Sequence, residues 1–351
     1  MTQTAKYANV SAKIGAQRSN LLSEAKLRAL SESKDLNDFV AQLKETAYQS
    51  QLANADPPYS GRKLERTFQE NLAETCIKVV KNSPKAASVY LSIFLRKAET
   101  ENIKALVKAV NGGLSAEQRE AQVYLIIEDF FKRRPAFEEA LKSQDLTQLS
   151  SAFAKTEYAL AMNYGLQSYE EGGSTTCFDV LVDKTYYERL FDTYTNLPTR
   201  EKPHALFYAS MESTSYVLLM LLRGKNLNHD VNWLRVAVPD AHFLSNDTVE
   251  SMVTATDFEA AFNIVQKSPY KDFFEKGEKP EEIIMSAEKA FKKAIYVHAA
   301  KSRISETFNI GVPLSFVYQK QAEASNLLTI SLGLESGLKA EEIQSLLLLG
   351  R

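Results

Sequence analysis

The sequence of 351 residues contains little glycine or proline, 13 and 10 residues respectively. Together they make up about 7% of the chain, whereas about 12% is average. Because these residues interrupt helices and strands, a chain that has few of them has few breaks between its regular elements. The shortage favours long helices over many short strands, in two or three domains or in one repetitive unit.

Strong net charge and paired cysteines are also missing. Lys and Arg number 42 against 44 Asp and Glu, so the net charge is −2 and no strong field attracts nucleic acid or an acidic membrane surface. The two cysteines, Cys76 and Cys177, lie too far apart to form a CxxC pair. This usage fits a reducing, cytosolic compartment better than a disulfide framework.

Long apolar runs are absent as well. The best run, from Val217 to Leu222, has six residues, whereas a membrane-spanning helix needs about 20. The first residues are polar, and we expect no signal peptide. An apolar share of 44% and a charged share of 25% are ordinary for a globular protein, so we predict an intracellular protein outside the bilayer.

The nucleotide-binding motifs are incomplete. Gly224-Lys225 is the only pair that resembles a phosphate-binding loop, but Leu219 stands where such a loop has glycine and Asn226 where it has Ser or Thr. We interpret this pair as part of a helix end. Gly172-Gly173 lacks a GxGxxG frame and is better explained as a linker.

The histidines show no metal-ligand spacing. None of the four, His204, His229, His242 and His298, belongs to an HExxH or HxxxH pattern. His229 next to Asp230 is a candidate acid–base pair, but Asp230 is more simply a helix cap. No DDxxD motif is present either. We therefore predict no catalytic residue, no cofactor and no metal site, although a site assembled from distant residues stays open.

Helical periodicity, in contrast, runs through almost the whole chain. Leu64, Phe68, Leu72, Cys76 and Val80 recur every four residues and line one face of a helix. No sustained alternation of apolar and polar residues indicates a sheet. The sequence therefore predicts an all-α fold.

Several helix starts can be located from their capping residues. Ser115-x-x-Gln118 and Thr256-x-x-Glu259 have the form of capping boxes. Pro280 precedes two acids, as expected for a proline in the first turn of a helix.

Three glutamates, Glu99, Glu212 and Glu323, are spaced 113 and 111 residues apart in similar surroundings. The residues three positions later are Asn102, Ser215 and Asn326, and those eighteen positions later are Glu117, Asp230 and Glu341. A glycine lies in each interval, which indicates one helix that stops and another that begins.

A second marker keeps the same phase. An apolar residue, a hydroxyl residue three positions later and a tyrosine five positions later recur at Tyr48, Tyr158 and Tyr270, which are 110 and 112 residues apart. We therefore predict a threefold repeat of about 111 residues. The expected domains are three related helical bundles over residues 1–122, 123–235 and 236–351, in a ring, arc or funnel with pseudo-threefold symmetry.

The repeated glutamates have two interpretations. As a functional set they would line the axis of such a funnel, and as a structural set they would pair with basic residues one helical turn away, such as Arg96 and Lys320. We favour the structural interpretation. The basic run Lys132-Arg133-Arg134, just before Pro135, is expected to complement the C-terminus of a helix.

The Glu-x-x-Asn-apolar element is best kept in Arg96–Ile103 and Lys320–Leu327. Together with Tyr7–Leu22 at the start, Tyr187–Asp192 in the middle and Ser336–Leu346 near the end, it resembles the C subunit of archaeal and vacuolar-type rotary ATPases, which is the d subunit in eukaryotes. The resemblance spans nearly the whole chain.

The sequence departs from that family's pattern after the Asn-apolar pair, where the family usually has a basic residue. Only Lys104 provides one, because Val217 and Leu328 stand in the other two copies. Ser215 also replaces the usual asparagine in the middle copy. These departures mark a divergent member.

The resemblance implies three helical bundles around a funnel and a non-catalytic central-stalk (rotor) subunit of a proton- or sodium-translocating ATPase or ATP synthase of the A-type or V-type. The implied partners are the central axle subunits of D and F type and the membrane proteolipid ring, with no nucleic acid and no membrane span. The implied location is peripheral, at the cytoplasmic face of a membrane. Two alternatives stay open: an unrelated all-α scaffold of three bundles, and an all-α enzyme.

Overall fold

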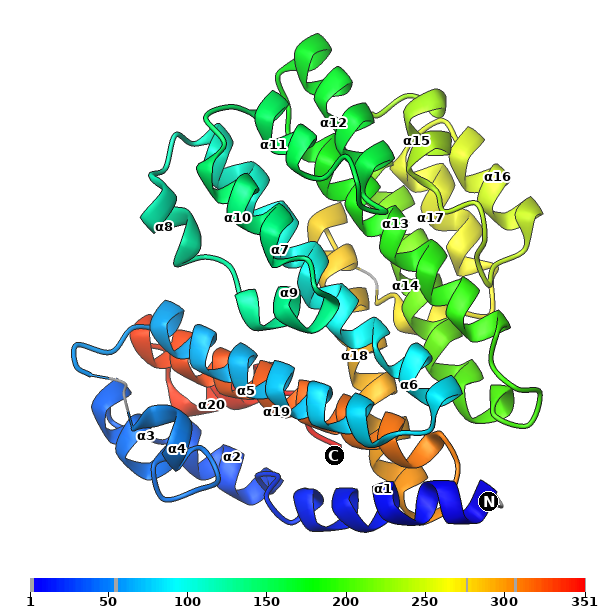
Figure 1. Ribbon diagram of the computed structural model, residues 1–351. Coiled ribbons are helices and arrows are strands. Elements are labelled where there is room, and N and C mark those ends of the chain that lie inside the picture. The colour runs from blue at the N-terminus through cyan, green and yellow to red at the C-terminus, as the bar shows by residue number, and fades with distance from the viewer. Residues whose placement is uncertain (1–2, 54–55, 276, 306–307, 351) are drawn as a thin grey trace. The chain divides into compact units, whose positions relative to one another are not determined.

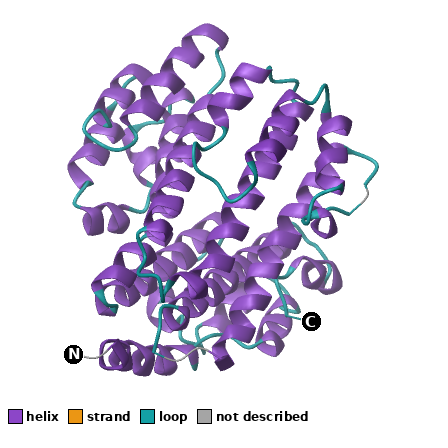
Figure 2. Ribbon diagram, turned by 90° about the vertical axis from the view of Figure 1, so that its right-hand side faces the viewer, coloured by secondary structure: helices purple, strands orange, loops and turns teal. Residues whose placement is uncertain are grey.

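The computed structural model describes residues 3–53, 56–275, 277–305 and 308–350. Within these ranges the chain forms helices and loops and no strand, as Figure 2 shows. The prediction of an all-α fold is confirmed. The scarcity of glycine and proline corresponds to long helices, of which α18 (Pro280–Ser305) has 26 residues.

The helices gather into two compact units, and each is described separately. Unit 1 consists of residues 1–92 and 293–351, and unit 2 consists of residues 93–292. The division of the sequence into three bundle repeats, and their arrangement as a funnel, stay predictions.

Unit 1 joins the two ends of the chain. Its helices, besides the second half of α18, are α1 (Gln3–Arg18), α2 (Glu24–Ser31), α3 (Leu36–Leu43), α4 (Gln49–Leu52), α5 (Gly61–Asn82), α6 (Lys85–Leu91), α19 (Gly311–Glu335) and α20 (Ala340–Leu346). Helices α5 and α19 lie side by side (Figure 1). One apolar core, which includes Phe39, Phe68 and Leu327, is shared by α2–α5, α19 and α20, and we call these helices the α19 group.

Unit 2 contains the middle of the chain. Its helices, besides the first half of α18, are α7 (Ile93–Asn111), α8 (Ala116–Glu120), α9 (Leu125–Phe131), α10 (Arg134–Lys142), α11 (Leu146–Ala152), α12 (Ala159–Gly172), α13 (Thr176–Thr195), α14 (Lys202–Asn226), α15 (Val231–Ala237), α16 (Asn246–Thr254), α17 (Phe258–Gln266) and the 3-10 helix η1 (Lys271–Phe273).

Two helix groups make up unit 2. Helices α7 and α9–α13 share an apolar core that runs from Ile103 to Val182, and together with α8, which packs against α7 and α10, they form the α7 group. Helices α14–α17, η1 and the first half of α18 form the α14 group, in which the ring of Phe274 contacts those of Phe262 and Phe291. Helix α13 packs against both α7 and α14 and is the wall between the two groups.

The predicted helix starts are largely correct. The capping box of Ser115 and Gln118 begins α8, and Pro280 begins α18. The box predicted at Thr256 is wrong by one residue, because Asp257 is the N-cap of α17 and accepts the N–H of Ala260 at 2.8 Å. Its carboxylate also interacts favourably with the positive end of the helix dipole.

Asp257 has a counterpart in each of the other two groups. Asp35 caps α3 and Asp145 caps α11 with the same bond to the N–H three residues later. Each of these aspartates lies thirteen residues before a marker tyrosine. The repeat therefore also extends to the caps of these helices.

The hydroxyl of the tyrosine marker forms the same turn three times. Thr46, Thr156 and Ser268 each donate to the carbonyl three residues earlier at 2.7 Å. Each also accepts the N–H of the marker tyrosine at 3.1–3.2 Å. A side chain that satisfies both backbone groups ends one helix and fixes the backbone that carries the tyrosine.

The long helices α7, α14 and α19 end in the left-handed conformation. Gly113 and Gly337, with φ of 69° and 71°, follow α7 and α19, and Asn228, with φ of 57°, follows α14. Gly224 lies in the last turn of α14, as predicted for a helix end, but its role is packing. A Cβ there would come within 2.4 Å of the Leu234 side chain.

The asparagine of the Glu-x-x-Asn element fastens a distant loop to its long helix. Asn102 accepts the N–H of Tyr124 at 2.9 Å and donates to its carbonyl at 3.4 Å. Asn326 does the same with Leu348, at 2.7 and 3.0 Å. In each pair the two residues are 22 positions apart. Ser215 is too short for this clamp and its hydroxyl bonds the carbonyl of Glu212 in its own helix.

Helix α14 is, among the described residues, the one helix that is long and apolar enough to cross a membrane. The mean hydropathy of its most apolar window is 1.3, and 72% of that window is buried inside the protein. It also carries the buried Glu212. These properties are those of a core helix.

We predict that Asn326→Ala lowers the free energy of unfolding by about 1–3 kcal/mol, because the backbone of the buried Leu348 loses both partners. Ser215→Ala, the matched control, should change it by less than about 0.5 kcal/mol. Urea unfolding midpoints measure both. Equal losses in the two variants would refute the clamp.

Candidate functional site

Each repeated glutamate is buried in its long helix. The exposed fractions of Glu99, Glu212 and Glu323 are 0%, 5% and 3%. Removing a carboxylate from water costs several kcal/mol unless cations or hydrogen-bond donors compensate it. The partners of these three residues therefore determine which helices must meet.

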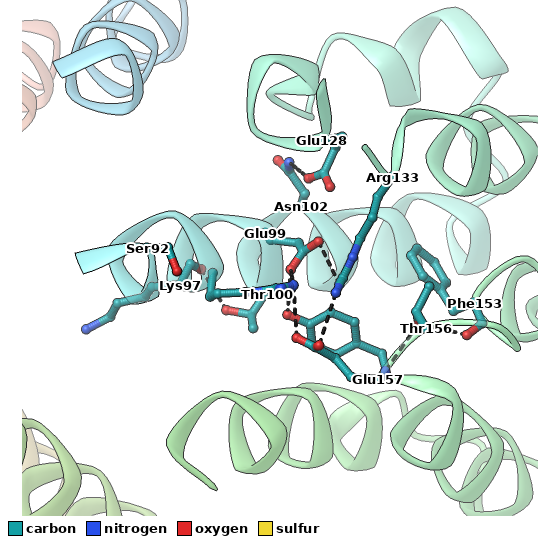
Figure 3. A network of polar contacts seen from close by, with 12 residues as sticks. Ser92, Lys97, Glu99, Thr100, Asn102, Glu128, Arg133, Phe153, Thr156 and Glu157 are labelled. Atoms are coloured by element: carbon teal, nitrogen blue, oxygen red, sulfur yellow. Dashed lines mark hydrogen bonds and ion pairs between the residues drawn. The ribbon is translucent and has the colours of Figure 1, made fainter. Parts of the chain in front are cut away.

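Glu99 lies in a ring of alternating charges (Figure 3). It accepts from Arg133, Arg96 and the hydroxyl of Tyr158, each at 2.9 Å. Glu157 closes the ring, because it contacts both arginines at 3.0 Å. The ring joins α7, the junction of α9 and α10, and the turn before α12.

Aromatic rings cover the arginines of this cluster. The guanidinium carbon of Arg96 lies 3.9 Å from the centroid of the Phe131 ring, and that of Arg133 lies 5.8 Å from the Tyr158 ring. Cations over aromatic faces are stabilised further when water is excluded. The charges are thus held between packed rings rather than in solvent.

Glu128 lies beside the ring and differs from the other acids. It is fully buried, and it accepts from the amide of Asn102 at 2.8 Å. Burial, and then the negative charge of Glu99, raise the pKa of Glu128 to about 9. Glu128 is therefore protonated at neutral pH, which leaves two carboxylates balanced by two guanidiniums.

Glu323 has a simpler set of partners in unit 1. The hydroxyl of Tyr48 donates to it at 2.8 Å, Lys320 at 2.6 Å, and the backbone N–H of Leu22 also donates to it. Burial and the charge of Glu323 raise the pKa of Tyr48 well above its usual value, so this hydroxyl remains a donor. The site connects α19 with two segments from the other end of the chain.

Glu212 is bound by the neighbouring helix group. Lys97 of α7 contacts it at 3.2 Å and the hydroxyl of Tyr186 on α13 donates to it at 3.1 Å. Burial works to lower the pKa of Lys97, but the negative charges of Glu212, Glu101 and Asp183 together raise it above its usual value. Lys97 therefore keeps its positive charge at neutral pH.

The predicted pairing with a basic residue three positions earlier is confirmed for Glu99 with Arg96 and for Glu323 with Lys320. Sequence analysis missed that the marker tyrosines Tyr158 and Tyr48 bond to these same glutamates. The nearly constant spacing between the tyrosines and the glutamates could have predicted this contact, because two residues that bond each other keep the same separation in each copy of a repeat.

The prediction for Lys132-Arg133-Arg134 is wrong for the two arginines. Lys132 is indeed the C-cap of α9, with φ of 58°. Arg133 turns inward to Glu99 and Glu157, and Arg134 pairs with Asp129. The left-handed Lys132 reverses the chain and brings Arg133 back over the core.

Lys104 uses its basic side chain only within the α7 group. It contacts Glu101 at 2.7 Å and Asp183 of α13 at 2.9 Å. Val217, its counterpart in α14, is fully buried instead. The departure from the family pattern thus replaces an ion pair by apolar packing.

The candidates for nucleotide binding and acid–base chemistry have structural roles. Lys225 donates to the carbonyls of Val253 and Ala255 at 2.7 and 2.6 Å. The ring of His229 stacks on Trp233 at 3.8 Å, and Asp230 caps α15 as predicted. Within the described ranges, no group of three or more His, Cys, Asp or Glu residues is arranged to hold a metal.

Comparison with known proteins identifies the family. The model of the ATP synthase (C/AC39) subunit family matches residues 10–346. The chain belongs to this family. The C subunit of the A-type ATP synthase of Methanocaldococcus jannaschii is 26% identical over 98% of this chain and 86% of its own length. Those of Pyrococcus furiosus and Thermococcus kodakarensis are each 23% identical, over 97% and 96% of this chain and 90% and 89% of their own.

We predict that Tyr158→Phe lowers the free energy of unfolding by about 1.5–3 kcal/mol, because a hydrogen bond to a buried charge is lost. Tyr270→Phe is the matched control, since its hydroxyl bonds no other described residue, and it should change stability by less than about 0.5 kcal/mol. Chemical denaturation compares the two. A loss at Tyr270 as large as that at Tyr158 would contradict the pairing.

Glu128→Gln should become increasingly stabilising as the pH rises. The folded pKa is raised, so the stability contributed by Glu128 is full below its unfolded pKa of about 4.3 and is lost as the pH approaches 9. The amide of the variant does not titrate, and the gap between variant and wild type should widen by up to about 1.4 kcal/mol per pH unit in this window. Urea midpoints from pH 5 to 9 measure the gap. A constant gap would show that Glu128 is ionised.

Proposed function

We propose that this chain is the central-stalk C subunit of an A-type or vacuolar-type rotary ATPase or ATP synthase, with no active site of its own. Its role is to couple the axle, made of D-type and F-type subunits, to the proteolipid ring of a proton- or sodium-translocating motor. The observation that carries the proposal is the family match over residues 10–346, together with relatives that align over nearly their whole length.

The buried charge networks support this role physically. A part that transmits torque must not yield internally, and closely packed helices deform little. Glu99 and Glu323 each bind side chains from segments far away in the sequence, such as Tyr158 and Tyr48. A buried pair is costly to break by removing one partner, about 3–5 kcal/mol, so these contacts resist shear between helices.

The proposed location is the cytoplasmic face of a membrane, as a peripheral part of a membrane-bound complex. In this arrangement the protein meets the ring through protein contacts. The net charge of −2 and the burial of α14 within its own protein agree with such a position.

The test is to purify the ATPase complex from cells with and without this chain. With it, membrane vesicles should pump ions when ATP is added. Without it, ATP hydrolysis by the head should continue while ion pumping falls to background, and adding the purified chain back should restore pumping.

An add-back of an unrelated all-α protein of similar size serves as the control. Pumping at the wild-type rate in vesicles that lack the chain would overturn the proposal. The chain would also fail as a stalk component if it did not co-purify with the axle and ring in stoichiometric amount.

A further inference from the structure

The middle glutamate has lost the partners that its counterparts find in their own helix groups. Three residues before Glu99 and Glu323 stand Arg96 and Lys320, but three residues before Glu212 stands Ala209. An alanine side chain cannot neutralise a buried carboxylate. Glu212 has no cation one turn away in α14.

The tyrosine of that group does not compensate for the loss. Tyr270 occupies the position of Tyr158 and Tyr48, and the same hydroxyl-capped turn presents it. Its ring lies 6.4 Å from that of Phe291, and its hydroxyl bonds no other described residue. Both standard partners are therefore missing from the α14 group.

The partners that Glu212 does have are specific to this copy. Tyr186 lies 26 positions before Glu212, and the same offset from Glu99 and Glu323 leads to Ala73 and Val297. Lys97 likewise corresponds to Ser210 and Gln321. The position three residues before Glu212 therefore lacks a cation, and Lys97 and Tyr186 supply a cation and a hydroxyl that the equivalent positions of the other copies do not have.

The residues next to Glu212 in α14 also make fewer polar bonds to other elements than their counterparts in α7 and α19 do. Ser215 lacks the asparagine clamp of the other two groups. Among the described residues, the fully buried hydroxyls of Ser213 and Thr214 have no hydrogen-bond partner. The polar bonds that α14 makes within its own group lie near its C-terminal end, from Arg223, Lys225 and Asn226, and not around Glu212.

We propose that the contact of Glu212 with Lys97 and Tyr186 is a latch between the two helix groups of unit 2, and that breaking it releases the α14 group while the α7 group stays closed. The released group is α14–α17 and η1 with the first half of α18. The latch joins α14 to α7 through Lys97 and to α13 through Tyr186.

Several other contacts between the groups come from α13. The hydroxyl of Tyr216 donates to the carbonyl of Val180 at 3.1 Å, Glu188 accepts the N–H of Asp240 at 3.1 Å, and the ring of Phe243 lies against α13. The ion pair of Lys184 with Asp240 is exposed to solvent, with Asp240 at 87%, and exposed pairs contribute little. The stacked rings of Tyr187 and Tyr216, 4.0 Å apart, join α13 and α14 without any charge. Once the latch is broken, α13 therefore serves as the hinge. This inference does not depend on the proposed function.

Hydrogen exchange of the full chain tests the latch. In Lys97→Met, amides of α16 and α17 should exchange at least tenfold faster than in the wild type, while amides of α10 and α11 should change less than twofold. Lys104→Met is the matched control, because Lys104 is a lysine of the same helix whose partners, Glu101 and Asp183, lie within the α7 group. It should leave exchange in α16 and α17 within twofold of the wild type.

Three results would overturn the latch. They are unchanged exchange in Lys97→Met, an equal increase in both groups, and an equal effect of Lys104→Met on α16 and α17. If Lys97→Met does not fold, Glu212→Gln is measured in its place, because the amide keeps the shape and can still bond Tyr186. It should raise exchange in α16 and α17 and not in α10 and α11, and any other pattern refutes the latch.

Discussion

A carboxylate buried in the middle of a long helix must be compensated by other side chains, and this requirement shapes all three helix groups. Glu99 is compensated by two arginines and a tyrosine from three separate elements. Glu323 is compensated by a lysine, a tyrosine and a backbone N–H. Because hydrocarbon packing has no preferred direction but a charge has specific partners, these contacts select one register among the many that apolar helices would accept.

Much of the fold was readable from the sequence, since helical periodicity and capping residues act locally. The all-α class, the Ser115 cap and the start of α18 at Pro280 needed only neighbouring residues. At Thr256 two neighbouring residues could each cap the helix, and the carboxylate of Asp257 took the position.

The in-phase markers predicted a repeat but not that its tyrosine and glutamate touch, because the bond from Tyr158 to Glu99 spans 59 residues and that from Tyr48 to Glu323 spans 275. The raised pKa of Glu128 could not be predicted from the sequence, because it results from burial and from the nearby Glu99, and both depend on the fold.

The three helix groups share some local contacts and differ in others. The hydroxyl-capped turns and the Asp35, Asp145 and Asp257 caps are the same in each group, because they satisfy backbone groups that every copy has. The side chains around the glutamates differ, because each copy needs only that its own charge be balanced. In a family of ATP synthase subunits where relatives of this chain are 21–26% identical to it, such exchanges of partners keep the architecture while most residues change.

The core of unit 1 is shared between the two ends of the chain, and this has a consequence for synthesis. Leu22 and Tyr48 bond Glu323, and Glu24 bonds Gly350, so these early residues have partners that are synthesised about 300 residues later. At about 5–20 residues per second, a separation of roughly 300 residues leaves α2–α5 waiting on the order of 15–60 s with their apolar faces uncovered. The α7 group has its whole core between Ile103 and Val182 and can close as it emerges. The α7 group can therefore close before the α19 group, whose core needs segments from both sides of it in the sequence.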